Sequence, residues 1–484
     1  MKKIISLCLA AAMTFGTAAA LHTAAAEKVK MGDADLNGVV NIVDATEIQR
    51  YLTEAVDFNA TQKAVADVDK SNKIEIADVT MIQRIAADFL TMDEEIEAIP
   101  EQPFNLTPAQ VREQGNAGVN DFSVRLLQSS VNAGQNTMVS PLSVLYALGM
   151  TANGAKGSTL SQMEKTIGMK RDLLNHYLKA YPSYNRESYS AAKLNLANSL
   201  WYNTNAAQTV SDSFSSTVSQ YYDAEIHQTA FNQAALNDIN GWVKKETDGM
   251  IPSVLDEINP QMLMYLINAV AFDAEWNRQY DPMFNVHPDT FTAENGETAD
   301  VEMMSSPESW LISDDNAQGF VKYFSDSNYA FAALLPDENV KLGDYVNSLT
   351  GEKLTKVLDS ERCYENLYAY LPKFELSYSE NLKDNLAEMG MPDAFVNGAA
   401  NFLDMVDAAP SPYISSVIHK TYIDVNERGT RAGAVTVIGM EAGSTPDEDS
   451  LPPITIRLDR PFLYMITNTN TNTPHFIGTV ENLS

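Results

Sequence analysis

The chain has 484 residues, and its 64 acidic residues against 33 lysines and arginines give a formal net charge of -31. This length suffices for two or three domains. A surface this acidic repels nucleic acid and anionic membranes, so we exclude nucleic-acid binding and expect no membrane partner.

Residues 1–26 have the features of a secretory signal. Lys2 and Lys3 precede an apolar run, and alanines at 24–26 provide small residues for cleavage before Glu27. The run is too short to span a bilayer with confidence, and no other long apolar stretch follows. We therefore expect a secreted, extracellular protein. An uncleaved membrane anchor is the alternative.

The cysteine content excludes a disulfide-stabilised scaffold. Cys8 leaves with the signal, so Cys363 stays alone in the mature chain. A chain this long can obtain its stability from a buried core. We interpret Cys363 as a packed thiol and not as a nucleophile, because no partner for catalysis is recognisable.

Residues 32–91 contain a duplication with a constant offset of 34 residues. Each copy places oxygen ligands at the first, third, fifth, ninth and twelfth positions of a Ca²⁺ loop, with a backbone carbonyl at the seventh. The first copy offers Asp33, Asp35, Asn37, Val39, Asn41 and Asp44. The second copy offers Asp67, Asp69, Ser71, Lys73, Glu75 and Asp78.

The spacing suits a hard cation, which requires six to eight oxygens around it. Gly38 allows the first loop to turn back, and Asn72 takes its place in the second, where asparagine tolerates a left-handed backbone. We expect two calcium ions, with weaker binding in the second loop. An acidic surface turn is the alternative, but two copies in register make it improbable.

Each loop runs into an apolar-periodic helix, and the pair of loop–helix units over 27–91 resembles a dockerin module. The resemblance implies a small all-α domain that docks through calcium-dependent contacts onto a cohesin domain of a scaffoldin, as in a cellulosome. It also implies that the near-symmetric copies permit two docking orientations. The implied contact positions are Ala45, Thr46, Gln49 and Arg50, with Val79, Thr80, Gln83 and Arg84 in the second copy.

An acidic stretch with two prolines, 92–106, reads as a linker before a domain that spans 107–484. This domain has no Gly-x-Ser-x-Gly elbow, no phosphate loop and no His-x-x-x-His pair, so we predict no enzyme. Helical patterns come early and strand-like runs come late, which favours an α+β fold with large antiparallel sheets.

Several segments of this domain, in order, resemble the serpin family of serine protease inhibitors. They include "SPLSVLYALGMTANGAKGST", "INGWVKKETDGMI", "LINAVAFDAEW", "HKTYIDVNERGT" and "DRPFLYMITNTNTNTPHFIGTV". With the dockerin, the chain resembles a cellulosome-associated bacterial serpin. The resemblance implies the serpin fold, with a large antiparallel central sheet, further sheets, helices and an exposed reactive-centre loop.

The resemblance also implies roles for individual residues. Trp276 matches the aromatic residue of the breach, the top of the sheet, although a plain core tryptophan is almost as good a reading. Glu427 matches the acid that begins the hinge. The residues that match the shutter, a polar cluster beneath the sheet, are Ser140, Ser143, Asn268 and His419.

The hinge continues through Gly429, which we expect to supply the turn at its entry point. In residues 430–440 the even-numbered face is small and uncharged, and the one charge, Arg431, lies on the other face. A strand that enters a packed sheet requires this, because burying a charge costs much free energy. The residues of this hinge face and its neighbours are Glu427, Gly429, Thr430, Ala432, Gly433 and Ala434.

This composition is typical of inhibitory serpins, which act as suicide substrates by loop cleavage and strand insertion. Counting from Glu427 places the reactive bond between Gly443 and Ser444, with 440–446 as the open interval. Counting back from Phe462 gives a bond near Ser450. Small residues before the bond suggest a subtilisin- or elastase-like target. The alternatives are a non-inhibitory serpin-fold binding module and, more remotely, a glycan-degrading enzyme.

Overall fold

The computed structural model describes residues 28–53, 56, 58–97, 104–185, 193–206, 208–406, 410–430 and 452–483. The predicted secretory signal lies outside these ranges, and so do Ala432, Gly433, Ala434 and the predicted reactive bond at Gly443 and Ser444. No helix in the described ranges is long and apolar enough to cross a membrane.

A small module, residues 28–97, is built on the two calcium-type loops. It comprises β1 Lys28–Lys30, α1 Ile42–Leu52, α2 Ala60–Ala66, α3 Ile76–Ala86 and β2 Glu95–Glu97. The last loop ligand caps the helix that follows: Asp44 accepts from the Asn41 amide, and Asp78 accepts from the Glu75 amide. Such caps satisfy amides that the first turn of a helix leaves unpaired.

The acidic stretch after the module is not entirely a linker. Residues 95–97 pair antiparallel with 28–30, and Lys70 forms an ion pair with Glu94 at 2.6 Å. The two ends of the module are thereby joined, and its all-α core gains a two-stranded sheet. Sequence periodicity gave no signal for β2, because three residues are too few to show an alternation.

The predicted contact positions within the module divide into buried and exposed residues. Ala45 and Val79 are buried in the module's own core together with Ile48 and Ile82, so the expectation that they face a partner was wrong. Helix periodicity explains this, because each core residue lies one turn from the next on the face shared by α1 and α3.

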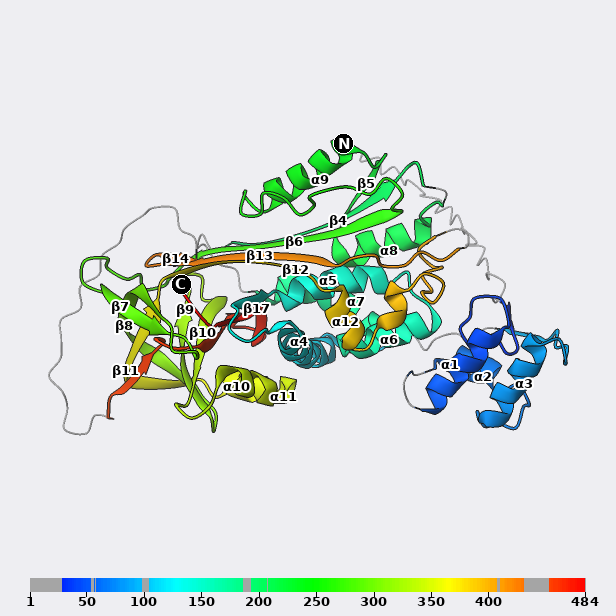
Figure 1. The fold of residues 1–484 in the computed structure, drawn as a ribbon, viewed down its shortest axis with the longest axis horizontal. Coiled ribbons are helices and arrows are strands. Elements are labelled where there is room, and N and C mark those ends of the chain that lie inside the picture. The colour runs from blue at the N-terminus through cyan, green and yellow to red at the C-terminus, as the bar shows by residue number, and fades with distance from the viewer. Residues whose placement is uncertain are drawn as a thin grey trace, which may run out of the picture.

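The large domain, residues 104–483, contains two sheets. The central sheet has six strands in the order β12-β13-β14-β6-β4-β5, antiparallel except for the β4–β5 pair. Figure 1 shows its long strands side by side, with α9 on one face and α5 on the other. Their bounds are β4 Lys193–Asn203, β5 Glu225–Thr229, β6 Met264–Glu275, β12 Phe374–Asn381, β13 Ile418–Val425 and β14 Gly429–Thr430.

The second sheet has nine strands and lies at the end opposite the small module (Figure 1). Its main path is β15-β11-β8-β9-β10-β16-β17-β3, and β7 pairs with β8. The bounds are β3 Thr137–Val139, β7 Val286–Thr292, β8 Thr298–Ser313, β9 Ala317–Tyr323, β10 Tyr329–Pro336, β11 Arg362–Pro372, β15 Ile454–Arg457, β16 Phe462–Asn468 and β17 Thr473–Val480.

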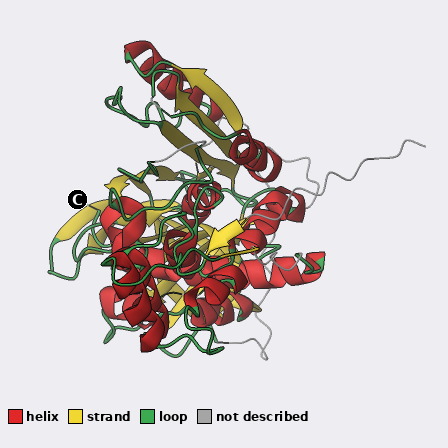
Figure 2. Ribbon diagram, turned by 90° about the vertical axis from the view of Figure 1, so that its right-hand side faces the viewer, coloured by secondary structure: helices red, strands yellow, loops and turns green. Residues whose placement is uncertain are grey.

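Helices dominate the end of the molecule that carries the small module (Figure 2). The helices of the large domain are α4 Pro108–Ser130, α5 Pro141–Ala152, α6 Gly157–Ile167, α7 Arg171–Ala180, α8 Asp212–Tyr222, α9 Gln233–Glu246, α10 Leu342–Ser348, α11 Gly351–Asp359 and α12 Lys383–Glu388. Two 3-10 turns, η1 Tyr181–Tyr184 and η2 Pro392–Phe395, complete the set in the described ranges.

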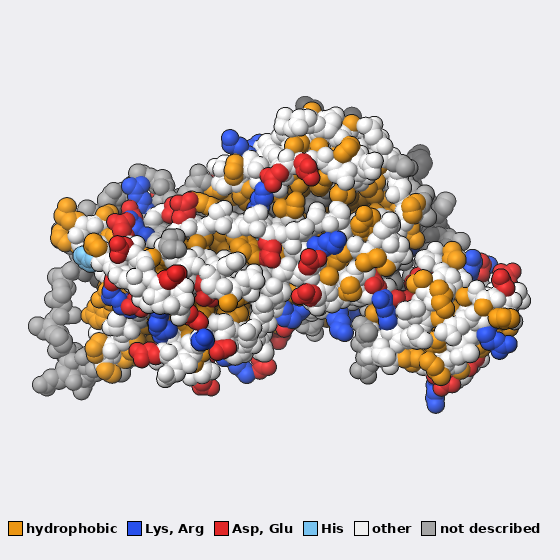
Figure 3. Space-filling model, in the orientation of Figure 1, with side chains coloured by type: hydrophobic (Ala, Val, Ile, Leu, Met, Phe, Trp, Pro, Cys, Tyr) orange, Lys and Arg blue, Asp and Glu red, His pale blue; other side chains and the backbone are white. Residues whose placement is uncertain are grey.

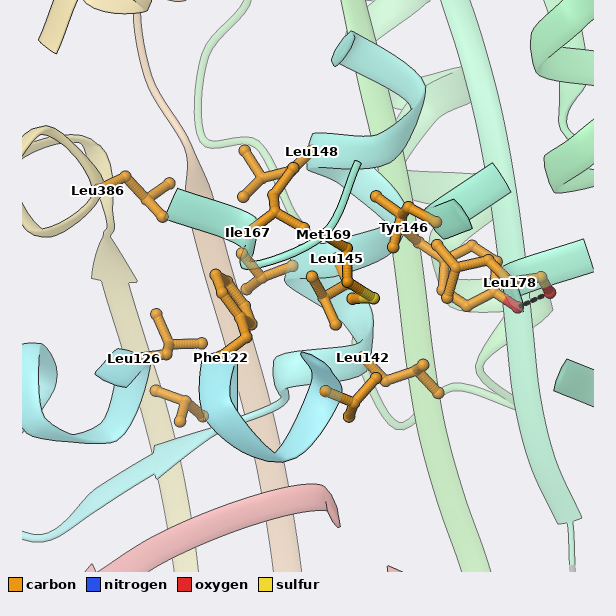
Figure 4. Packing of buried hydrophobic residues seen from close by; sticks show 14 of the residues in the cluster. Phe122, Leu126, Leu142, Leu145, Tyr146, Leu148, Ile167, Met169, Leu178 and Leu386 are labelled. Carbon is orange, nitrogen blue, oxygen red and sulfur yellow. Dashed lines mark hydrogen bonds between the residues drawn. The ribbon is translucent and has the colours of Figure 1, made fainter. Parts of the chain in front are cut away.

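Helices α4 and α5 contribute many residues to the core beneath the central sheet. Phe122 and Leu126 of α4 pack against Leu142 and Leu145 of α5, all almost fully buried (Figure 4). Ser140 begins α5, because its hydroxyl accepts a hydrogen bond from the Ser143 amide. This cap fixes both serines below the sheet.

Cys363 is exposed on β11, so the expectation of a packed thiol was wrong. Strict alternation would place Cys363 on the same face as the buried Leu367, but the pairing of β11 with β8 shifts register between these two residues, and the first residues of the strand are exposed. Composition alone does not reveal this register.

Candidate functional site

The hinge begins inside the central sheet. Thr430 pairs with Val425 of β13 on one side and with Ala274 of β6 on the other, while Gly429 pairs with Glu275. A Cβ atom at position 429 would collide with the Ala274 carbonyl. Glycine is therefore required by the close approach of two backbones. Two residues of the predicted hinge, Gly429 and Thr430, are therefore part of the central sheet.

An ion pair anchors the residue that precedes this strand. The Lys373 ammonium lies 2.9 Å from a Glu427 carboxylate oxygen and 2.9 Å from one of Glu302. Burial raises the pKa of Glu427, but the hydrogen bond from Lys373 and its positive charge hold the pKa below its ordinary value. Glu427 is therefore an anionic anchor. Sequence reasoning missed Lys373, because a single lysine between two strands gives no pattern.

Trp276 holds the turn that leads into the hinge. Its indole Nε1 donates to the Asn426 carbonyl and its amide donates to the Arg428 carbonyl, both at 2.8 Å. The ring stacks on Phe324 with centroids 4.5 Å apart, and the Lys322 ammonium lies 5.7 Å from its centre. Such a position explains a buried tryptophan at the end of β6, since an indole requires a partner for its N–H.

The four predicted shutter residues lie together beneath the sheet as two pairs. His419 on β13 accepts a hydrogen bond from the Ser140 amide at 3.0 Å, and the Ser143 hydroxyl donates to the Asn268 amide oxygen on β6. Asn268 in turn donates to Asn198 on β4 at 2.7 Å, a partner that no sequence pattern had indicated. Each pair attaches one strand to α5.

Burial determines the charge of the histidine in this cluster. His419 is enclosed, and loss of solvent lowers its pKa from 6.5 to about 4. At neutral pH the ring is therefore uncharged, and its Nε2 atom accepts the hydrogen bond from Ser140. A neutral ring is compatible with a buried polar cluster, whereas an imidazolium would require a counterion.

A series of cavities continues the line of β14 between β6 and β13. In the described part of the sheet, β13 pairs with β12 and β14 while β6 pairs with β14 and β4, so β14 is the link between them. The cavities measure about 10, 20 and 170 Å³. Each cavity is lined by residues of β6 on one side and of β13 or the segment before it on the other. The pairs are Phe272 and Ile423 for the smallest cavity, Val270 and Thr421 for the next, and Leu266 and Val417 for the largest of the three.

We call this space the slot. Its cavities of about 10 and 20 Å³ hold at most about one water each, so a further strand could enter only if β6 and β13 moved apart. The slot lies between β6 and β13. In the described structure, the backbone groups of these strands that face the slot have no strand partner past Thr430. Unpaired backbone amides and carbonyls inside a sheet are unfavourable, so an entering strand gains hydrogen bonds along its whole length.

The two loops of the small module gather their carboxylates. Asp33, Asp35 and Asp44 offer oxygens within 4.8 Å of one another and are buried; Asp67, Asp69 and Asp78 do the same with more exposure. The turn positions are left-handed in both, with φ of 88° at Gly38 and 62° at Asn72. The other predicted ligands, Asn37, Val39 and Asn41, and Ser71, Lys73 and Glu75, lie on the same loops.

The first carboxylate cluster fits a divalent cation. Burial, followed by repulsion from Asp44 and Asp33, raises the pKa of Asp35, and burial raises the pKa of Asp44. Three buried carboxylates without a cation repel one another. The oxygen-only donor set is the set that calcium prefers.

Comparison with known proteins supports both parts of the chain. A model described as serpin (serine protease inhibitor) matches residues 117–483, and one described as dockerin type I domain matches 31–85. The crystal structure of a thermophilic serpin, tengpin, in the native state is 39% identical, with a TM-score of 0.71 over 80% of this chain and 98% of that one.

Two curated relatives extend the comparison. The leukocyte elastase inhibitor of Xenopus laevis is 31% identical over 371 residues, which are 72% of this chain and 93% of the relative. An uncharacterized serpin-like protein of Methanosarcina acetivorans is 27% identical over 370 residues, which are 75% and 84% of the two chains.

We predict that removing the Lys373 charge weakens the fold. Lys373→Met leaves Glu427 partly buried without its ion pair, and we expect the free energy of unfolding to fall by about 1 kcal/mol. Urea denaturation measures this. Lys341→Met is the matched control, because Lys341 is 74% exposed and lies 3.9 Å from Glu294. An equal loss in both variants would contradict the anchoring role of Lys373.

We predict an acid-sensitive contribution from His419. Its folded pKa of about 4 lies below the ordinary 6.5, so its stabilising contribution is complete above pH 6.5 and is lost as the pH falls towards 4. When the pH is lowered from about 7.5 to about 5, the free energy of unfolding should fall in both proteins. The fall should be about 2 kcal/mol smaller in His419→Gln than in wild type. Urea midpoints at both pH values test this.

The control for this titration is His287→Gln, which replaces an exposed ring on β7. It should follow the wild-type pH dependence. A His419→Gln protein with the wild-type acid sensitivity would show that other groups carry the effect.

Proposed function

The chain belongs to the serpin family and carries a dockerin module, and on that premise we propose that it is a secreted inhibitor of serine-type proteases that docks onto a cohesin-bearing scaffoldin. Serpins target proteases, and dockerin type I domains typically bind calcium and cohesins. The observation that supports the inhibitory function is the slot, the line of cavities that continues beyond β14 between β6 and β13.

The register of β14 specifies where each later hinge residue would lie. Thr430 faces Ala274 and Val425, so two residues on Ala432 would face Phe272 and Ile423. By the same count, Ala434 would face Val270 and Thr421, and Thr436 would reach Asn268 and His419. The small, uncharged face of the hinge would thus lie in the narrow part of the slot nearest β14, where the cavities measure about 10 and 20 Å³.

The proposed mechanism is suicide-substrate inhibition. The protease's serine attacks the Gly443 carbonyl, the bond to Ser444 breaks, and the loop is left esterified to the protease. The freed hinge then enters the slot and forms on the order of ten backbone hydrogen bonds at about 1 kcal/mol each. The attached protease is carried with it, and displacing one oxyanion donor already slows deacylation by roughly 10²–10³.

The small module supplies the proposed attachment to a scaffoldin. Calcium would neutralise the carboxylates and order the two loops. The first loop would hold it through Asp33, Asp35, Asn37, Asn41, Asp44 and the Val39 carbonyl, and the second through Asp67, Asp69, Ser71, Glu75, Asp78 and the Lys73 carbonyl. Helices α1 and α3 then present their exposed faces.

Incubation with a subtilisin-like and an elastase-like protease tests the inhibitory function. We expect a complex that survives SDS and has the summed mass of both partners. The released C-terminal peptide should begin within 440–446, at Ser444 by our count. Cleavage without a complex would support the alternative, a non-inhibitory serpin-fold binding module of the same extracellular assembly.

We predict that a charge on the inward face abolishes trapping. Ala434→Glu would place a carboxylate between Val270 and Thr421, where burial without a counterion costs several kcal/mol. The variant should still be cleaved, but the yield of SDS-stable complex should fall at least about tenfold. Val435→Glu, which by the same count would lie on the outward face beside the half-buried Lys420, is the matched control and should still form the complex. Equal yields from both variants would contradict the proposed register.

We predict two calcium sites that can be removed one at a time. Asp44→Asn and Asp78→Asn each remove a carboxylate that closes one loop, so each variant should bind about one ion where wild type binds about two. Isothermal titration calorimetry measures the number of ions bound. Asp93→Asn, which lies outside both loops, should change nothing. A stoichiometry that stays at two in either loop variant would contradict the assignment of that loop.

A further inference from the structure

The two repeats of the dockerin occupy different environments, although their sequences are nearly equivalent. Arg50 on α1 and Arg84 on α3 occupy the same position, 34 residues apart. Arg84 is exposed, whereas Arg50 is only 35% exposed and forms an ion pair with Asp393 of the serpin domain. The symmetry of the sequence is therefore broken by the tertiary structure.

The contact between Arg50 and Asp393 is bidentate. The Arg50 guanidinium binds both carboxylate oxygens of Asp393, with the Nη2–Oδ1 distance at 3.2 Å. It also lies 3.0 Å from Glu47, a buried acid on the same helix. Bidentate arginine–carboxylate pairs are among the stronger polar contacts in proteins and fix orientation as well as distance.

The serpin domain holds Asp393 in place for this contact. Gln162 on α6 donates to Asp393 at 2.7 Å and accepts from its amide at 3.1 Å, and Ser158 donates at 3.3 Å. Asp393 itself is only 6% exposed. A buried acid with two partners in its own domain and one arginine from another domain indicates a formed interface and not an incidental surface contact.

A second contact joins the first calcium loop to the same surface. Asn401 donates to the Asp35 backbone carbonyl at 3.1 Å. The backbone of Gly157, at the start of α6, approaches that carbonyl so closely that a Cβ atom would collide with it. The first repeat thus meets the serpin domain through both its loop and its helix.

We propose that the serpin domain is the ligand of the first dockerin repeat, so that the module offers only its second repeat to a cohesin. The inference rests on the proposed docking function. A partner that lies along α1 would have to displace the Arg50–Asp393 pair, whereas the equivalent part of α3 is free of the serpin domain in the described structure. The sequence symmetry permits two docking orientations, and the folded chain retains one.

The second repeat has the surface of a binding face. Ile76 at the start of α3 is 65% exposed and its equivalent on α1, Ile42, is 55% exposed, so the repeats differ at the other end of the helix, where Phe89 is 79% exposed. Arg84 and Gln83 are exposed between them. Figure 3 shows hydrophobic side chains interspersed with charged ones on the visible face of the module. Apolar anchors beside an arginine suit a partner face with an apolar centre and an acidic margin.

Hydrogen exchange on the full chain in calcium tests the intramolecular contact without any partner. Asp393→Ala should accelerate exchange in α1 residues 47–52 by about tenfold and leave α3 unchanged. Arg50→Ala should reciprocally accelerate exchange in residues 157–164. Asp337→Ala, an exposed acid elsewhere on the serpin domain, is the control. Unchanged exchange in both interface variants would overturn the proposal.

Titration with a purified type I cohesin tests the consequence for docking. Arg84→Ala should weaken binding by about tenfold, whereas Arg50→Ala should leave it within about twofold. In an Asp393→Ala background, Arg84→Ala should cost much less, because the first repeat is then released. Equal losses from Arg50→Ala and Arg84→Ala would overturn the single-orientation proposal.

The two experiments separate the inference from the function on which it rests. If the wild-type chain binds no cohesin, the proposed docking function fails, and hydrogen exchange alone decides whether the first repeat is held by the serpin domain. If cohesin binds and exchange in α1 is insensitive to Asp393→Ala, docking stands and the intramolecular contact is refuted.

Discussion

The central constraint on the described part of this molecule is that β6 and β13 form no ladder with each other and are joined through β14. Two residues, Gly429 and Thr430, bridge these strands, and the slot continues beyond them through cavities of up to about 170 Å³. A sheet that leaves backbone groups unpaired has free energy in reserve. The proposed function depends on the slot in two ways. The small residues of the predicted hinge would have to fit into it, and the polar clusters attach the strands on either side of it.

The polar groups around the slot keep each wall attached to the core while the slot stays open. His419 binds β13 to the start of α5, and Asn268 binds β6 to Ser143 of the same helix. At the upper end, Lys373 fixes Glu427 and Trp276 fixes the turn before the hinge. These contacts attach both strands to their surroundings without pairing them to each other, which is the arrangement that the proposed strand insertion requires.

The sequence predicted the parts of the molecule that depend on local pattern. The order of helices before strands in the large domain and the two acidic loops follow from hydrophobic periodicity and ligand spacing. The residues matched to the shutter came from family motifs, and the structure places them close together, while their role stays a prediction. The sequence did not predict Lys373 beside Glu427, Asn198 beside Asn268, or Asp393 beside Arg50. These partners are separated by tens to hundreds of residues, and a lone polar side chain has no period. The buried Ala45 and Val79 were misjudged for a related reason, because family positions were read without the helix face they occupy.

Thermal unfolding before and after cleavage of the reactive loop tests the central claim most directly. If residues beyond Thr430 fill the slot, on the order of ten new backbone hydrogen bonds form at about 1 kcal/mol each. At 2–4 °C per kcal/mol, the cleaved protein should melt roughly 20 °C or more above the intact one. A cleaved protein that melts at the same temperature or lower would show that the slot does not receive the hinge.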